Sequence, residues 1–156
     1  MGIISDTHGL LRTEALSALQ GCELIVHAGD VGKQEILEQL QKLAPVIAVR
    51  GNTDGGIWAS NLPLGATAKL GNATILVLHI LEHLDLDPAV AGLNLVVSGH
   101  SHKPACTTKS GVIYLNPGSA GPRRFKLPIT VARVHLTEPL WRITFIDLET
   151  GAIFQP

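Results

Sequence analysis

The chain has 156 residues, 46% hydrophobic and 16% charged, which excludes a disordered, collagen-like or coiled-coil protein and predicts one domain over residues 1–156. A net charge of −1 without runs of like charge argues against a general nucleic-acid binder. Cys22 and Cys106 lack disulfide-framework or CxxC spacing, and no segment resembles a membrane span or a signal peptide. We therefore expect a cytoplasmic protein with no membrane partner. A homo-oligomer is compatible with the sequence.

The first half of the chain alternates short apolar runs with helical patterns. Buried strands are predicted at residues 1–5, 23–28 and 45–49, and amphipathic helices are predicted at residues 10–19 and 33–43. Strands separated by helices of about ten residues favour βαβ units and a parallel sheet.

The second half has the pattern of antiparallel and mixed strands. Residues 66–70 and 74–78 flank Gly71-Asn72, a turn signal that predicts a hairpin. Further strands are predicted at residues 94–98, 111–115, 129–136 and 141–148. The last two alternate apolar with polar residues, which suits a sheet with one solvated face. The sequence therefore predicts an α/β domain with a mixed sheet system.

Polar motifs directly follow five of these predicted strands. The carboxyl ends of strands form the binding crevice of open α/β sheets, so we expect the motifs to lie together. Their chemistry-bearing residues, in chain order, are Asp6, His8, Asp30, Asn52, His79, His100 and His102. We expect His27, which lies inside a strand, to be a hydrogen-bonded group of the core instead.

This residue set has the composition of a metal centre. In extended backbone, residues i and i+2 point to the same side, so Asp6 can converge with His8, and His100 with His102. Mixed oxygen and nitrogen ligands suit Mn²⁺, Fe or Zn²⁺ better than Ca²⁺ or Mg²⁺. Seven ligands are too many for one such ion, but they fit two ions if a carboxylate bridges. Each motif alone is weak evidence for a metal site, whereas the five motifs together are specific evidence for one.

The motifs DTH, GD, GNTD, H and GHSH, in this order over residues 6–102, resemble the calcineurin-like metallophosphoesterase signature. The later Asn116-Pro117-Gly118-Ser119, followed by Pro122-Arg123, resembles the small single-domain bacterial and archaeal phosphodiesterases of that superfamily. The resemblance implies a four-layer α/β/β/α sandwich of two mixed β-sheets flanked by helices.

The resemblance also implies how the residues share two divalent ions, with Mn²⁺ favoured and Fe, Zn²⁺ or Ni²⁺ as alternatives. One ion would be held by Asp6, His8, Asp30 and His102. The other would be held by Asp30, Asn52, His79 and His100, with Asp30 bridging. Asp30 and Asn52 would thereby act in catalysis. Asn116, Ser119 and Arg123 are candidate contacts for the substrate phosphate, although Arg123 could equally be an ordinary surface charge.

The implied activity is hydrolysis of a small phosphate ester, with a hydroxide that bridges the two ions as the nucleophile. Many superfamily members carry His after the GN motif as a proton donor, whereas this chain has Thr53, and Ile80 follows His79 where Gly is usual. We expect a phosphodiesterase whose ions are lost below about pH 6, because ligating His must be neutral. The alternatives are a phosphomonoesterase or nuclease with the same site, and a non-enzymatic protein-interaction scaffold.

Overall fold

The computed structural model describes residues 1–137 and 140–156, whose strands form two β-sheets. The six-stranded sheet has the order β11-β10-β9-β1-β2-β3, and the five-stranded sheet has the order β4-β5-β6-β8-β7. The strands are β1 Gly2–Ile4, β2 Ile25–His27, β3 Val46–Ala48, β4 Gly65–Leu70, β5 Ala73–Leu78, β6 Leu95–Val97, β7 Ala105–Lys109, β8 Val112–Asn116, β9 Thr130–Thr137, β10 Leu140–Asp147 and β11 Ile153–Phe154.

Both sheets contain parallel and antiparallel pairs. In the six-stranded sheet β1, β2 and β3 are parallel, and β9 lies antiparallel to β1 on its other side. Intervening helices return the chain between parallel strands, as the alternating pattern predicts. In the five-stranded sheet the predicted β4–β5 hairpin is followed by β6 and β8, which are parallel to β5. The predicted α/β class with two mixed sheets is confirmed.

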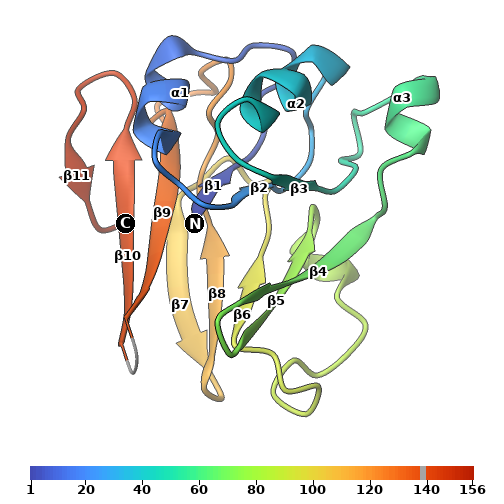
Figure 1. Ribbon diagram of the computed structural model, residues 1–156, viewed down its shortest axis with the longest axis vertical. Coiled ribbons are helices and arrows are strands. Elements are labelled where there is room, and N and C mark those ends of the chain that lie inside the picture. The colour runs from blue at the N-terminus through green and yellow to red at the C-terminus, as the bar shows by residue number, and fades with distance from the viewer. Residues whose placement is uncertain (138–139) are drawn as a thin grey trace.

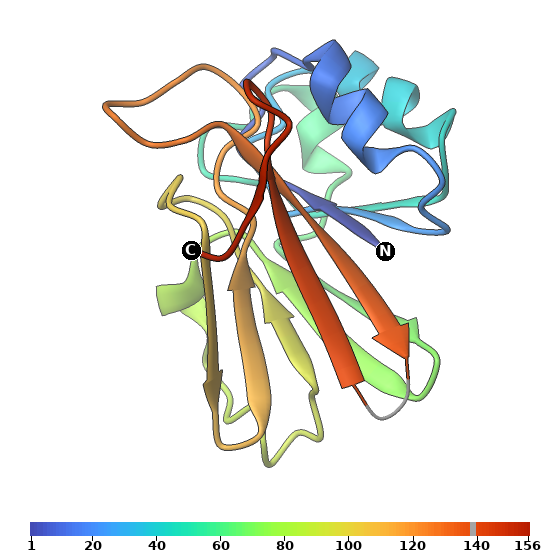
Figure 2. The ribbon, with the colours of Figure 1, turned by 90° about the vertical axis from the view of Figure 1, so that its left-hand side faces the viewer.

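The helices are short and gather mainly on one side of the sandwich (Figure 1). They are α1 Thr13–Leu19, α2 Gln34–Gln41, α3 Ile57–Ser60 and the 3₁₀ turn η1 Leu81–His83. Figure 2 shows α1 and α2 on the side of the six-stranded sheet that faces away from the five-stranded sheet. None of the helices in the described part of the chain has the length and apolar character needed to cross a membrane.

Successive residues of β1 point to opposite faces and enter two different apolar cores. Ile3 packs between the two sheets, in a cluster that includes Ile75 of β5. Its neighbour Ile4 packs beneath the helices, with Leu19 of α1 and Leu40 of α2. Burial on both faces explains why the first strand has a continuous apolar run rather than an alternating one.

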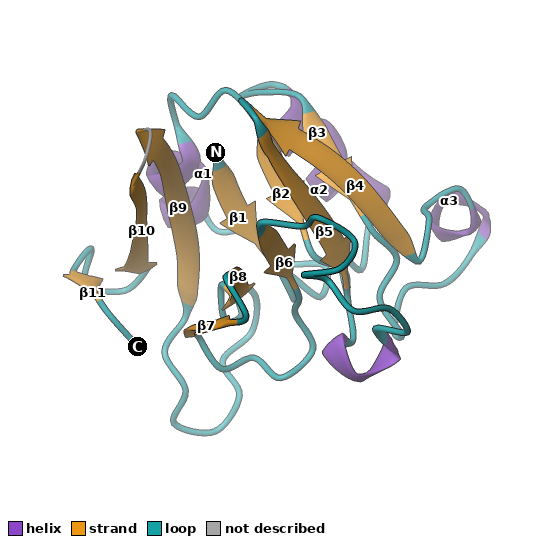
Figure 3. Cartoon of the chain, turned by 90° about the horizontal axis from the view of Figure 1, so that it is seen from below, coloured by secondary structure: helices purple, strands orange, loops and turns teal. Residues whose placement is uncertain are grey.

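The outer face of the five-stranded sheet is covered more thinly. A third apolar cluster joins Leu78 and Val96 of that sheet to Leu84 and Leu93 of the segment between β5 and β6. Figure 3 shows the 3₁₀ turn of this segment on the side of the five-stranded sheet that faces away from the six-stranded sheet. Among the described residues, this layer consists of η1 and loops rather than of α-helices.

Two edge strands were not predicted. β7 reads Ala-Cys-Thr-Thr-Lys and is mostly exposed, so it lacks the apolar alternation that marks a strand. It forms because the turn at Ser110-Gly111 folds it antiparallel onto β8. β11 is two residues long and pairs with β10 at the edge of the six-stranded sheet. Both strands depend on a partner strand rather than on their own composition.

Candidate metal centre

The polar motifs that follow the strands meet at one end of the sandwich. Those after β1, β2 and β3 come from the six-stranded sheet, and those after β5 and β6 come from the five-stranded sheet. A continuous series of side-chain contacts joins all seven predicted ligands: Asp6, His8, Asp30, Asn52, His79, His100 and His102.

Backbone strain is concentrated at these residues. Asp6, His8, Asp30, His100 and His102 all have positive φ angles, between 45° and 66°. Residues other than glycine rarely adopt this left-handed backbone conformation, which costs about 1–3 kcal/mol per residue and is typical of functional sites. The same turns bend the chain sharply after each strand and bring the side chains back toward the cluster.

Asp6, His8 and His102 form the first cluster. Nε2 of His102 lies 3.3 Å from Oδ1 of Asp6 and 3.3 Å from Nε2 of His8. The other carboxylate oxygen of Asp6 accepts a hydrogen bond from the backbone N–H of His100. Oδ1 of Asp6 is buried and has no hydrogen-bond partner among the described residues. Leaving a buried carboxylate oxygen unpaired is costly, and a cation between these three residues would remove that cost.

Asp30, His79 and Asn52 form the second cluster. Nδ1 of His79 lies 2.7 Å from the backbone carbonyl oxygen of Ala28, and a carbonyl only accepts, so Nδ1 carries the proton. In the neutral ring, Nε2 therefore presents a lone pair. It faces Oδ2 of Asp30 at 3.3 Å and Oδ1 of Asn52 at 3.1 Å. Electron-rich atoms converge on one point here as well.

The two clusters are contiguous through their carboxylates. Nε2 of His8 lies 3.8 Å from Asp30 and 3.9 Å from Asp6. Asp6, Asp30 and His79 also form a set whose candidate ligand atoms all lie within 4.8 Å of one another. Convergent carboxylate oxygens and imidazole nitrogens are the ligands that divalent transition metals prefer. The residues present therefore fit a metal centre with more than one position for an ion.

The protonation of the second cluster reflects the same attraction for positive charge. Burial alone raises the pKa of Asp30, but hydrogen bonds from His79 and the Thr53 backbone N–H outweigh it and hold the pKa well below its usual value. Burial alone lowers the pKa of His79, but the hydrogen bond with Asp30 and the Ala28 carbonyl outweigh it and raise the pKa. In the metal-free chain, His79 therefore binds a proton more readily than a free imidazole does, at the nitrogen that faces the place suited to an ion.

His27 lies behind the clusters as a hydrogen-bonded core group. It is fully buried, and Nε2 lies 2.9 Å from the hydroxyl oxygen of Thr7. That hydroxyl donates to the carbonyl oxygen of Val31, so it accepts from His27. Burial lowers the pKa of His27 to about 4, which keeps the ring neutral. The ring thus connects β2 to the residue between Asp6 and His8.

The profile of the calcineurin-like phosphoesterase superfamily domain matches residues 1–139. The chain belongs to this superfamily. A "probable metallophosphoesterase" of Methanothermobacter thermautotrophicus is 31% identical, over 96% of this chain and 87% of that protein. A second one, of Methanocaldococcus jannaschii, is 34% identical over 76% of this chain and 67% of that protein. The phosphodiesterase YfcE of Escherichia coli is 30% identical over 74% of this chain and 76% of that protein.

Solved structures confirm the calcineurin-like fold. Vacuolar Protein Sorting 29 of Cryptosporidium parvum has a TM-score of 0.83 with 21% identity, over 98% of this chain and 93% of that chain. Vps29 of Entamoeba histolytica, determined in complex with Zn²⁺, has a TM-score of 0.78 with 21% identity, over 99% of this chain and 96% of that chain. At these identities the likeness shows the fold alone.

Asn116 and Ser119, two of the residues predicted to contact the substrate of this calcineurin-like chain, form hydrogen bonds to the loops that carry candidate metal ligands. The Asn116 amide donates to the Gly99 carbonyl at 2.6 Å and to the Ser101 hydroxyl at 3.1 Å, and its oxygen accepts from the Gly118 N–H. The Ser119 hydroxyl donates to the Asp6 carbonyl at 3.0 Å. Both side chains are buried. Their hydrogen bonds position the turns that carry His100, His102 and Asp6.

Arg123 and Arg124 differ in their surroundings. Arg123 forms an ion pair with Glu149 and donates to the Leu127 carbonyl, both outside the metal clusters. Burial lowers the pKa of His8 and outweighs the carboxylates of Asp30 and Asp6, which raise it. His102 and, as the smallest contribution, the positive charge of Arg124 lower this pKa further. The structure thus places the charge of Arg124 within electrostatic reach of the first cluster. Adjacent arginines on an irregular loop offer no sequence signal to tell them apart.

Proposed function

We propose that this chain is a dinuclear-metal-dependent phosphodiesterase. The observation that carries the proposal is the pair of contiguous clusters, in which electron-rich atoms converge and the buried Oδ1 of Asp6 lacks a donor. The name of the E. coli relative, a phosphodiesterase at 30% identity, supports the same activity. When bound, two divalent ions activate a water molecule and polarise the phosphoryl oxygens.

The chain's own residues have distinct parts in this proposal. Asp6, His8, Asp30 and His102 hold one ion, and Asp30, Asn52, His79 and His100 hold the other. Two carboxylates against two divalent cations leave an excess of positive charge that attracts an anionic ester. We propose Mn²⁺ as the native metal, while the Zn²⁺ complex of a neighbour with this fold supports Zn²⁺ as an alternative.

We favour diesters over monoesters on charge, because a diester carries one negative charge whereas a monoester dianion would compete with the nucleophile for the ions. The leaving group sets a separate limit, since a departing alkoxide needs a proton donor and an acidic phenolate does not. Thr53 lies beside the first cluster, with its hydroxyl 3.5 Å from Nδ1 of His8, and it offers no titratable proton donor. We therefore propose acidic, aryl-type leaving groups. Asn116 and Ser119 remain proposed parts of the phosphate-binding loop, residues 116–124, and within this loop we propose Arg124 in place of Arg123 as the positive charge that acts on the substrate, because Arg123 pairs with Glu149.

The deciding experiment compares hydrolysis of bis-p-nitrophenyl phosphate with that of p-nitrophenyl phosphate by the Mn²⁺-loaded and Zn²⁺-loaded chain. We expect kcat/KM to be at least about tenfold higher for the diester, which is about 1.4 kcal/mol in transition-state free energy. Asp30→Asn should abolish the activity, whereas Asp87→Asn, an exposed control, should preserve it. Faster monoester hydrolysis would reject the diester preference. Absence of hydrolysis with both metals bound would favour the interaction-scaffold alternative.

A further inference from the structure

A cavity of about 520 Å³ lies beside the second cluster and has no part in the function proposed so far. Separate segments build its walls: the loop after β3, the residues that lead into β4, strand β5, and the segment after β5. Six aliphatic side chains line it: Leu64, Leu76, Leu78, Ile80, Leu84 and Leu86. Six polar side chains share the lining: Arg50, Asn52, Asp54, His79, His83 and Asp85. A cavity of this size that combines aliphatic walls with polar groups is typical of a small-molecule site.

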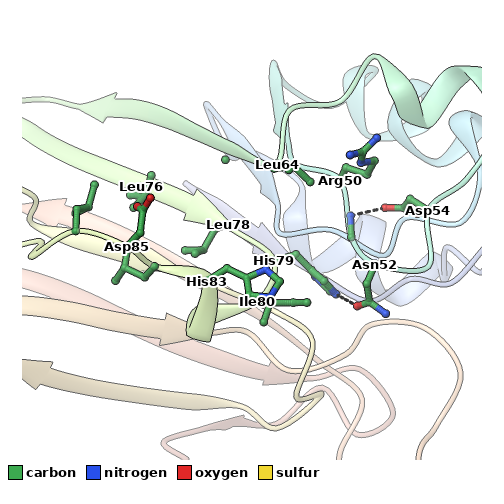
Figure 4. A pocket seen from close by; sticks show the side chains of 14 residues that line it. Arg50, Asn52, Asp54, Leu64, Leu76, Leu78, His79, Ile80, His83 and Asp85 are labelled. Atoms are coloured by element: carbon green, nitrogen blue, oxygen red, sulfur yellow. Dashed lines mark hydrogen bonds between the residues drawn. The ribbon is translucent and has the colours of Figure 1, made fainter.

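The cavity opens directly onto the metal ligands. Asn52 and His79 line it and also belong to the second cluster, where their side chains lie 3.1 Å apart. Figure 4 shows this pair at one end of the lining, with Leu76 and Asp85 toward the other end. An ester group of a phosphate held at the clusters can therefore reach the aliphatic walls.

The charged groups of the cavity limit what that ester group can be. The carboxylate of Asp54 accepts hydrogen bonds from the backbone N–H groups of Gly32 and Gly51, so it is already paired. Arg50, near the Asn52 end, forms no side-chain hydrogen bond or ion pair with the residues that the structure describes. Asp85 places a carboxylate at the other end, where it would repel a second negative charge.

Two of the aliphatic side chains are left in contact with solvent. Leu64 is 67% exposed and Leu86 is 43% exposed, and both face the same cavity. Single exposed leucines are common, but two at one cavity can be covered by one ligand. Each CH₂ group buried there would strengthen binding by about fourfold.

We propose that this cavity is the subsite for an uncharged apolar ester group, and that the substrate class is a phosphodiester in which at least one ester group is an uncharged aliphatic or aromatic hydrocarbon. The inference rests on the proposed function, because the ion clusters are what would hold the phosphate beside the cavity. Arg50 supplies a positive charge on the phosphate side, and the aliphatic walls take the organic group. Substrates with a further phosphate in this direction are disfavoured by Asp85.

Calorimetry with symmetrical diesters tests the subsite without requiring hydrolysis. Dimethyl, dibutyl and dibenzyl phosphate each carry one negative charge and differ in their apolar groups. We expect the Mn²⁺-loaded full chain to bind dibutyl and dibenzyl phosphate at least about tenfold more tightly than dimethyl phosphate. Equal affinities for the three would overturn the proposal. A clear preference in a chain that does not hydrolyse bis-p-nitrophenyl phosphate would support the subsite and reject the hydrolase.

Matched variants test whether this cavity causes the tighter binding of diesters with larger apolar groups. Leu64→Asn combined with Leu86→Asn changes two exposed positions without changing charge, and it should remove the preference for dibutyl phosphate while dimethyl phosphate binds as before. Ile57→Asn combined with Val90→Asn is the control, since these side chains are 88% and 86% exposed and do not line the cavity. On the metal-free chain, benzyl alcohol should shift the methyl NMR signals of Leu64 and Leu86. A preference that survives in the cavity variant, or unshifted signals, would contradict the assignment.

Discussion

The imidazole of His79 is fixed by its contact with Ala28, whose carbonyl oxygen lies 2.7 Å from Nδ1. This hydrogen bond leaves Nε2 as the atom that faces Asp30. A ligating nitrogen must be unprotonated, so a proton and a metal ion compete for the same atom. The contact therefore links metal affinity to pH.

The first prediction is that metal affinity decreases as the pH is lowered, and that this decrease begins at a pH above 6.5. Burial alone lowers the pKa of His79, but Asp30 and Ala28 raise it above its usual 6.5 in the metal-free chain. Below that raised pKa, the apparent affinity for Mn²⁺ should fall about tenfold per pH unit, because binding then releases a proton. Calorimetry in buffers with different ionisation enthalpies measures this proton.

The raised pKa of His79 also predicts how the stability of the metal-free chain depends on pH. A group whose folded pKa is raised stabilises the fold below its unfolded pKa, and this contribution is lost as pH rises through the folded pKa. The metal-free chain should thus lose this contribution above pH 6.5, and the metal-loaded chain should not. Mn²⁺ affinity that is constant between pH 6 and pH 8 would contradict the assignment of His79 as a ligand.

The second prediction concerns the number of ions. Elemental analysis after dialysis against Mn²⁺ should give close to two ions per chain. Asp30→Asn should lower the occupancy of both positions, because its carboxylate contacts His8 of the first cluster and His79 of the second. His8→Ala should retain about one ion, because His8 contributes to the first cluster only. If Asp30→Asn lost no more metal than His8→Ala, Asp30 would not be the bridging ligand.

The third prediction follows from Thr53, whose hydroxyl lies near His8. Without an imidazole at this position, rates on a series of diesters should fall steeply as the pKa of the leaving group rises. Thr53→His should raise the rate on alkyl esters by about 10²-fold and change p-nitrophenyl esters little, since general acid catalysis is typically worth that factor. Thr53→Asn is the matched control, with no titratable group. A rate independent of leaving-group pKa in the wild type would contradict the argument.

The fourth prediction separates the two arginines of the phosphate-binding loop. Arg124→Ala should raise KM for bis-p-nitrophenyl phosphate by about tenfold, because its charge acts on the first cluster. Arg123→Ala should change KM by less than about twofold and cost less than about 1 kcal/mol of stability, because its partner Glu149 is half exposed. A larger KM effect at Arg123 would restore the substrate contact expected from the sequence.

The sequence alone indicated the candidate ligands and the fold class. The period of apolar residues located β1, β2 and β3, and the residues that follow them are the ones that converge. The i, i+2 spacing of Asp6 and His8 indicated the right residues for the wrong reason: both have positive φ angles, so a sharp turn rather than extended backbone brings them together. The motif order then indicated the superfamily, which the profile match over residues 1–139 confirmed.

Only the tertiary structure decided which groups face one another. His8 and His102 are 94 residues apart, and their contact exists because the two sheets pack together. The same packing gathers Leu64 and Leu86 at one cavity, although each belongs to an unremarkable loop pattern. Gly51 shows the limit of sequence reasoning most clearly: a Cβ there would lie 2.1 Å from Oδ1 of Asp30, a close approach between loops that no local pattern encodes. The periodicity of apolar residues determines helices and strands, whereas contacts between residues far apart in the sequence depend on how those helices and strands pack.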